Sequence, residues 1–110
     1  MKRAKEPEPV LLGSLEEQVM LAVIRTAADA YGMQVRRELE SVTGRHIAIG
    51  AVYATLDRIE AKGLVLSSRI TTADGAERRV FEVTRAGMRS LEQTRALRDR
   101  LWTGVQLGTG

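Results

Sequence analysis

The stretch from Ala48 to Gly63, which decides the fold we expect for the rest of the chain, reads Ala-Ile-Gly-Ala-Val-Tyr-Ala-Thr-Leu-Asp-Arg-Ile-Glu-Ala-Lys-Gly. Its apolar residues Val52, Leu56 and Ile59 recur at steps of four and three, and Gly63 follows four residues later. This spacing places them on one side of a helix. We expect that side to face a core.

The opposite side of this predicted helix carries small residues around a few hydrogen-bonding groups. It comprises Ala51, Ala54, Arg58 and Ala61, flanked by Tyr53 and Asp57. No carboxylate lies three or four residues from Arg58, so its partner must come from another element. One interpretation is a surface helix with Arg58 paired to Glu82 or Asp74. The other is a helix that enters the major groove of DNA, where an arginine can bind guanine or phosphate.

Length and composition exclude several classes of protein. A chain of 110 residues corresponds to one domain, which buries roughly 65% of the surface of its unfolded form. With no cysteine and a single histidine, His46, the sequence predicts no metal site and no cofactor. That histidine is far from any paired carboxylates, and no glycine-rich phosphate loop follows a strand. We therefore expect no enzyme activity.

The N-terminal residues and the net charge indicate the location and the kind of partner. Residues 1–12 are charged and contain Pro7 and Pro9, so we expect a mobile arm. They include no apolar run long enough for a signal peptide or a membrane span, which predicts a cytoplasmic protein without a membrane partner. The net charge of +3 and the pI near 9.8 fit a polyanionic partner, although many proteins that never bind nucleic acid carry such a charge.

Two helices are predicted before the central one. Ser14 and Glu17 match a capping box, which starts a helix that runs to about Ala28. The second runs to about Val42 and is ended by Thr43-Gly44. The outward Arg36 and Arg37 of the second helix are either solvated or directed at phosphate. His46-Ile47 is long enough only for a brief strand, and His46 is expected at the surface.

A hairpin and a last helix follow the central helix. Alternation predicts strands over residues 64–70 and 78–83, with the turn at residues 72–76. Thr84 offers an N-cap oxygen for the last helix, and the glycines at its end predict fraying. The broad apolar stripe of this helix, interrupted by Arg98, comprises Leu91, Leu97, Leu101, Trp102 and Val105.

The predicted order of elements is helix, helix, short strand, helix, hairpin, helix, which is the layout of a winged helix-turn-helix. We expect an α+β fold, mainly α, with an added C-terminal dimerisation helix. The expected organisation is a mobile arm over residues 1–12, a winged helix-turn-helix domain over 13–84, the dimerisation helix over 85–104 and a frayed tail over 105–110. Such a fold does not by itself determine function.

Residues at several places resemble the PadR-like transcriptional regulators. They are Leu12-Gly13-Ser14-Leu15-Glu16, Tyr31-Gly32, the run from Gly50 to Val65, Arg78-Arg79 and Thr84-Arg85-Ala86-Gly87. The resemblance covers residues 11 to about 103, and the run from Gly50 to Val65 is too specific for a chance match. The C-terminal region is short, so the chain is similar to the small subgroup with a single C-terminal helix.

The resemblance implies a homodimeric DNA-binding regulator, usually a repressor, whose third helix reads the major groove and whose wing contacts the backbone. It implies a DNA-binding surface made of Tyr31, Ala51, Tyr53, Ala54, Thr55, Arg58, Arg78 and Arg79. The helical wheel agrees for Tyr53 and Arg58 but puts Thr55 beside the core, where it would only pack. The wing departs from the family pattern at Val80-Phe81, where paired tyrosines are common, and at Glu82, where a basic residue is common.

The apolar stripe of the last helix has two predicted roles. It is too large for a lone helix to leave in water, so we expect a homodimer interface of Leu91, Leu97, Leu101, Trp102 and Val105, with an inverted-repeat operator. Alternatively, the stripe folds back on the first helix of its own chain. We expect Trp102 to anchor the dimer. The other interpretation, since some PadR-like proteins enclose planar aromatic effectors there, is that Trp102 and Arg98 bind a small aromatic effector that releases the operator.

A different function remains open, that of a winged-helix module that binds protein as an anti-activator or scaffold, without specific DNA binding. Residues 31–85 hold nine Lys or Arg against seven Asp or Glu, an excess of only two. The placement of the outward residues outweighs this count. The sequence therefore predicts specific binding to double-stranded DNA, with the protein module as the alternative.

Overall fold

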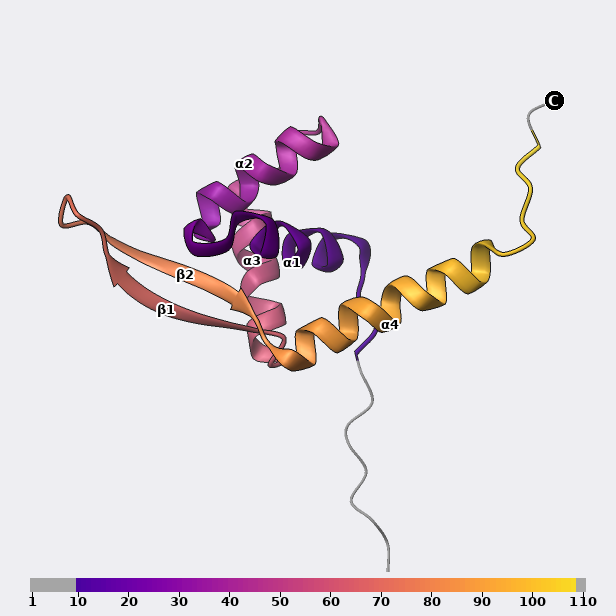
Figure 1. Ribbon diagram of the computed structural model, residues 1–110. Coiled ribbons are helices and arrows are strands. Elements are labelled where there is room, and N and C mark those ends of the chain that lie inside the picture. The colour runs from indigo at the N-terminus through magenta and orange to yellow at the C-terminus, as the bar shows by residue number, and fades with distance from the viewer. Residues whose placement is uncertain (1–9, 109–110) are drawn as a thin grey trace, which may run out of the picture.

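The structure is a computed structural model that describes residues 10–108. Its elements are α1 (Ser14–Thr26), a short 3-10 helix η1 (Ala27–Asp29), α2 (Gly32–Thr43), α3 (Ile49–Ala61), β1 (Val65–Thr71), β2 (Glu77–Val83) and α4 (Arg85–Trp102). Figure 1 shows α1, α2 and α3 gathered in the centre, with the β1–β2 hairpin projecting to one side and α4 leaving to the other. The expected fold class is confirmed: the molecule is mainly helical, with one two-stranded sheet after the third helix.

The first helix begins one residue earlier than the sequence predicts. Gly13 takes the N-cap position, and its backbone N–H donates to the Glu16 carboxylate at 3.0 Å. The expected capping box of Ser14 and Glu17 is wrong, because Ser14 already lies inside the helix and Glu17 forms an ion pair with Arg98 of α4.

The core lies where α1, α2 and α3 meet the base of the hairpin. Val52, Leu56 and Ile59 are fully buried, as their spacing predicts. Gly63 does not share this buried side, because α3 ends at Ala61 and Gly63 turns the chain towards β1 with a φ of 76°. The other buried apolar residues are Val19, Met20, Ala22, Val23, Ala30, Val35, Leu39, Leu64, Val65, Phe81 and Leu91.

The short strand predicted at His46-Ile47 is wrong. The Glu40 carboxylate accepts the Ile47 N–H at 2.9 Å and lies 2.9 Å from the His46 Nδ1, so local side-chain bonds hold this segment as a loop. The hairpin is instead bridged by Tyr31, which pairs antiparallel with Val80 just before α2. Gly44 ends α2 in the left-handed conformation, as its position predicts.

The hairpin pairs antiparallel from Val65 opposite Val83 to Thr71 opposite Glu77. This register places Ser67 opposite Phe81 and Arg69 opposite Arg79. All eight of these residues share one face, which turns towards α3 and the core because Val65 and Phe81 are buried. The other face carries Leu66, Ser68, Ile70, Arg78, Val80 and Glu82.

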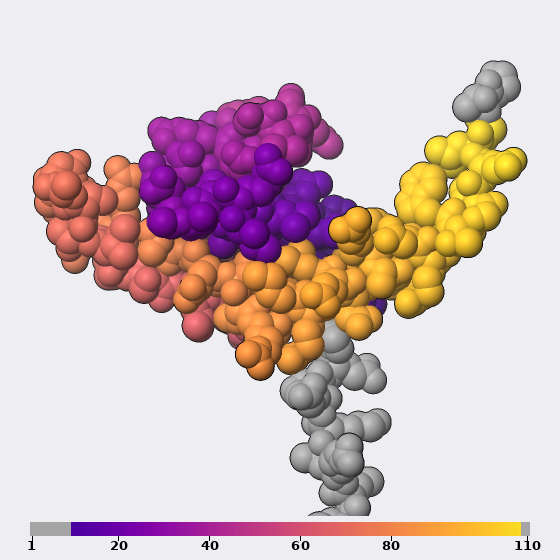
Figure 2. Space-filling model, viewed as in Figure 1, coloured from indigo at the N-terminus to yellow at the C-terminus, as the bar shows by residue number. Residues whose placement is uncertain are grey.

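The last helix starts as predicted and ends slightly early. Thr84 is its N-cap and accepts the Gly87 N–H at 3.0 Å. The first half packs on the body of the molecule, whereas the second half extends beyond it, at the opposite end from the wing tip (Figures 1 and 2). The expected helix over residues 85–104 is two residues shorter, because the helix ends at Trp102, and Val105 lies outside it.

The segment expected to be a mobile arm is described only in part, since residues 1–9 lie outside the described residues. Leu12 is held against α4, where its N–H donates to the Thr94 hydroxyl at 3.1 Å. Within residues 10–108, no helix has the length and apolar character needed to cross a membrane.

Candidate nucleic-acid interface

The outward face of α3 is built as the sequence predicts, with one exception. Ala51 and Ala54 are exposed, and they separate Tyr53, which is 39% exposed, from the Arg58 side chain, which is 54% exposed. Thr55 is only 1% exposed, and its hydroxyl donates to the Ala51 carbonyl at 2.7 Å. Inclusion of Thr55 in the DNA-binding surface is therefore wrong, because the helix turns this side chain into the core.

The partner of Arg58 is a residue on α1. The Arg58 Nε lies 3.8 Å from a Glu16 carboxylate oxygen, and the same oxygen accepts from the Lys62 Nζ at 2.8 Å. The hydrogen bond from Lys62, more than any other contact, lowers the pKa of Glu16. The predicted partners Glu82 and Asp74 are wrong. The Asp74 carboxylate is occupied within the wing turn, where the Thr72 hydroxyl and the Ala76 N–H donate to it.

Tyr53 lies over the first residue of α2. A Cβ built on Gly32 would lie 2.4 Å from the Tyr53 Cζ and 2.6 Å from its hydroxyl oxygen, so only glycine allows this approach. The neighbouring Tyr31 is half-buried, and the Arg78 guanidinium stacks over its ring, 4.2 Å from the centroid. Three predicted site residues, Tyr31, Tyr53 and Arg78, are thus brought together at the start of α2 from three different elements.

Arg79 lies in different surroundings. It donates from Nη1 to the Asp57 carboxylate at 3.0 Å, from Nη2 to the Glu60 carboxylate, and from Nε to the Ser67 hydroxyl at 3.1 Å. Its guanidinium also stacks over the Phe81 ring, 4.7 Å from the centroid. The Ser67 hydroxyl, followed by Arg79, lowers the pKa of Glu60. The structure therefore joins the wing to α3 through Arg79, and does not leave this arginine free as it leaves Arg58 half-exposed.

One arginine that the sequence reasoning missed lies on the same face of the wing. Arg69 is exposed and is paired across the ladder with Arg79. It forms no ion pair with any residue of the described range 10–108. The strand alternation already placed Arg69 with Ser67, but only the register of the hairpin shows that it lies beside Arg79.

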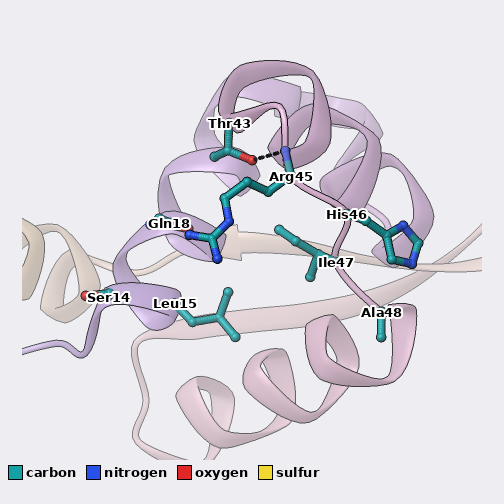
Figure 3. Close-up of a pocket in the computed structure, with 8 residues that line it drawn as sticks. All are labelled: Ser14, Leu15, Gln18, Thr43, Arg45, His46, Ile47 and Ala48. Carbon is teal, nitrogen blue, oxygen red and sulfur yellow. Dashed lines mark hydrogen bonds between the residues drawn. The ribbon is translucent and has the colours of Figure 1, made fainter.

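A hollow near the α2–α3 loop contains none of the predicted DNA-binding residues. Figure 3 shows the Arg45 side chain extending across this hollow towards Gln18 of α1, while His46 turns outward. His46 has 77% of its side chain exposed, which agrees with the expected surface position. The backbone N–H of Arg45 donates to the Thr43 hydroxyl at 3.2 Å. The lining residues are Ser14, Leu15, Gln18, Thr43, Arg45, His46, Ile47 and Ala48.

The apolar stripe of α4 is buried at its start and exposed at its end. Leu91 is buried and Leu97 is half-buried, so folding back on the same chain accounts for the first part of the stripe. The last three residues, Leu101, Trp102 and Val105, are 69%, 55% and 49% exposed. The Arg98 guanidinium pairs with Glu17 of α1 and makes no cation–π contact with Trp102.

A three-helix body, a β-hairpin wing after the third helix and an exposed face on that helix define a winged helix-turn-helix protein. The model of the PadR-like family of transcriptional regulators matches residues 20–93. The transcriptional regulator Rv3488 of Mycobacterium tuberculosis (strain ATCC 25618 / H37Rv) is 39% identical over 84 residues, which cover 74% of this chain and 77% of that protein. The chain therefore belongs to the PadR-like family of transcriptional regulators.

Solved structures of the same family share the fold. A PadR family transcriptional regulator from Eggerthella lenta DSM 2243 superimposes with a TM-score of 0.64 at 26% identity, covering 82% of each chain. The PadR-like regulator BC4206 from Bacillus cereus strain ATCC 14579 superimposes with a TM-score of 0.67 at 20% identity, covering 81% of this chain and 84% of that one. The family is one of transcriptional regulators, which agrees with the expectation that the protein is not an enzyme.

Proposed function

We propose that this regulator binds a specific inverted-repeat operator in double-stranded DNA as a homodimer and represses transcription. The observation that carries the proposal is the outward face of α3, where exposed alanines leave room for a close approach and Arg58 extends beside them. Small side chains let a helix enter the major groove, and an arginine there can donate two hydrogen bonds to guanine.

The surroundings of Arg58 support its role in reading bases. Its contact with Glu16 is long, at 3.8 Å, and the stronger partner of that carboxylate is Lys62 at 2.8 Å. Arg58 can therefore turn to a base without leaving Glu16 unpaired. Tyr31, Tyr53 and Arg78, which gather at the start of α2, are proposed to bind phosphate, because hydroxyl groups and stacked arginines at the edge of a recognition helix position the backbone.

The experiment is to select bound sites from random DNA and then to compare Arg58→Ala with Arg95→Ala on the preferred site. Arg95 is an arginine of α4 with 77% of its side chain exposed, so it controls for the loss of one positive charge. Arg58→Ala should weaken binding by ~1 to 3 kcal/mol and relax discrimination at one base pair. Unchanged affinity and base preference in a folded Arg58→Ala protein would return Arg58 to a structural role.

Salt dependence separates this function from that of a module that binds protein. A complex that neutralises several phosphates loses orders of magnitude in affinity over a few-fold rise in salt, whereas an apolar protein interface does not. Repression itself is tested with a reporter gene placed behind the selected site. Transcription that rises when the protein is supplied would replace the repressor by an activator.

The homodimer is supported by the far half of α4. Leu101 and Trp102 lie on a helix that projects from the body, where their exposed apolar surface favours burial against a second copy. Two copies related by a two-fold axis would present recognition helices to half-sites ~34 Å apart. Sedimentation velocity on Leu101→Gln, with the exposed Met88→Gln of the same helix as control, should show a monomer for the first variant only. A wild-type monomer at micromolar concentration would contradict the proposal.

Release by a small aromatic effector is the least supported part of the proposal. Trp102 is exposed and could stack on a planar ring, but Arg98 is occupied by Glu17, so an acidic ligand would have to compete with a carboxylate for it. Titration of planar aromatic compounds against Trp102 fluorescence and operator binding tests the site. Quenching and operator release that disappear together in a dimeric Trp102→Leu protein support an effector. No quenching in the wild type leaves Trp102 as a packing residue.

A further inference from the structure

The two arginines that face each other across the wing have opposite surroundings. Arg69 and Arg79 are register partners on the face of the hairpin that turns towards α3. Arg79 is surrounded by two carboxylates, a hydroxyl and an aromatic ring, whereas Arg69 is exposed and forms no ion pair within the described chain. This difference is not visible in the sequence, where both are arginines within short polar strands.

We propose that Arg79 is a positioning residue that fixes the wing against the recognition helix, and that Arg69 is the arginine on this face of the wing that binds a DNA phosphate. The proposal rests on the DNA binding proposed above and reassigns one of its residues. It gives the two arginines of one cross-strand pair separate roles.

The bonds of Arg79 connect β1, β2 and α3. Nε and both terminal nitrogens already donate, to Ser67 of β1 and to Asp57 and Glu60 of α3. Glu60 in turn accepts the Ser67 N–H at 2.9 Å and the Ser67 hydroxyl at 2.7 Å, so both of its oxygens are used. A guanidinium with this many fixed partners sets the angle between the wing and α3, because a rotation of the hairpin would break all of these bonds together.

The same bonds argue against a phosphate contact by Arg79. If its guanidinium moved to DNA, the carboxylates of Asp57 and Glu60 would lose their cation on the side of α3 that approaches the backbone. Two uncompensated carboxylates near a phosphate would oppose binding by like-charge repulsion. Arg79 instead neutralises them, which makes this part of the surface acceptable to DNA.

Arg69 has the properties that Arg79 lacks. Two arginines directly opposite each other in a hairpin repel, but Asp57 and Glu60 compensate the charge of Arg79, so Arg69 can stay beside it. It lies nearer the wing tip than Ser67, on the face that follows α3. Arg78 projects from the other face and stacks on Tyr31, so Arg69 is the unpaired cation on the α3 side of the described wing.

The experiment measures affinity for the selected DNA site as a function of salt for the wild type, Arg69→Ala, Arg79→Ala and Arg79→Lys, with Arg95→Ala as the charge control. Loss of one phosphate contact lowers the slope of log K against log salt by ~0.9, relative to the control. Arg69→Ala should show this change. Both Arg79 variants should bind several-fold more weakly with the slope of the control, since lysine cannot reach three partners at once.

Hydrogen exchange of the hairpin amides in the free protein gives a second readout. Both Arg79 variants should exchange faster in β1 and β2, whereas Arg69→Ala should exchange like the wild type. A slope lowered by ~0.9 in Arg79→Ala, with unchanged exchange, would overturn the positioning role, and an unchanged slope in Arg69→Ala would overturn the phosphate role. If Arg79→Ala does not fold, Arg79→Lys decides. A wild type without specific, salt-sensitive DNA binding refutes the proposed function itself, and exchange then still reports on the Arg79 bonds.

Discussion

One added methyl group at Gly87 tests how closely α4 is docked on the body. A Cβ at this position would lie 2.1 Å from the Leu64 carbonyl oxygen, 2.7 Å from Val83 Cγ1 and 3.0 Å from Met20 Cε. The first of these atoms belongs to the backbone, so α4 has to move by about an ångström or more. That carbonyl also accepts the Thr84 N–H at 3.0 Å, and the movement therefore disturbs the N-cap of α4 as well.

Gly87→Ala should lower the free energy of unfolding by about 1 to 3 kcal/mol. Overpacking costs ~1–3 kcal/mol and a damaged N-cap ~1 kcal/mol, against at most ~1 kcal/mol gained from the higher helix propensity of alanine. The matched control is Gly50→Ala in the first turn of α3, where a Cβ meets nothing within 4 Å. Urea unfolding followed by circular dichroism, at one fixed protein concentration, compares the two variants. A Gly87→Ala protein as stable as Gly50→Ala would refute the close docking of α4.

Three further changes test the backbone, the interface and the ion pairs. Ala27 has φ 51° and ψ −119°, which an L-residue rarely adopts, so Ala27→Gly should raise the urea midpoint by relieving strain of ~1 kcal/mol, and a lower midpoint would contradict the strain. Gly32→Ala should leave stability nearly unchanged but weaken operator binding several-fold, because its Cβ displaces the flexible ring of Tyr53; equal affinity would remove Tyr53 from the interface. The pKa values of Glu16, Glu40 and Glu60 are lowered in the folded state, so their stabilisation is complete above the ordinary value of 4.5 and is lost as pH falls through the lower folded values. Urea midpoints should therefore fall less steeply below about pH 4.5 in Glu60→Gln than in the wild type, and equal slopes would count against this carboxylate.

Features set by neighbouring residues could be predicted from the sequence. The inward side of α3, the left-handed end of α2 at Gly44 and the N-cap at Thr84 each depend on residues within four positions, and all three are present. The start of α1 was predicted one residue late, because Ser14 and Gly13 are both acceptable N-caps and the choice depends on which glutamate is needed elsewhere.

Features set by distant residues could not be predicted. Arg58 was expected to pair with Glu82 or Asp74, but its partner, Glu16, lies on a helix whose crossing with α3 no local pattern specifies. The strand expected at His46-Ile47 failed for the same reason, since a loop bonded to Glu40 and a short strand have similar local sequences. The division between Arg69 and Arg79 depends on the hairpin register together with the placement of α3.

The two neighbouring glutamates of α1 link the recognition helix to the C-terminal helix. Glu16 pairs with Lys62 and Arg58 of α3, and Glu17 pairs with Arg98 of α4, while both glutamates are only 9% exposed. A movement of α4 that withdraws Arg98 would leave the Glu17 carboxylate largely buried without its cation, which is costly. It follows that α4 cannot move far unless α1 moves with it, and that α1 carries the residue that holds Arg58. The arrangement of the proposed dimer and the orientation of the proposed base-reading arginine are therefore coupled through two adjacent residues.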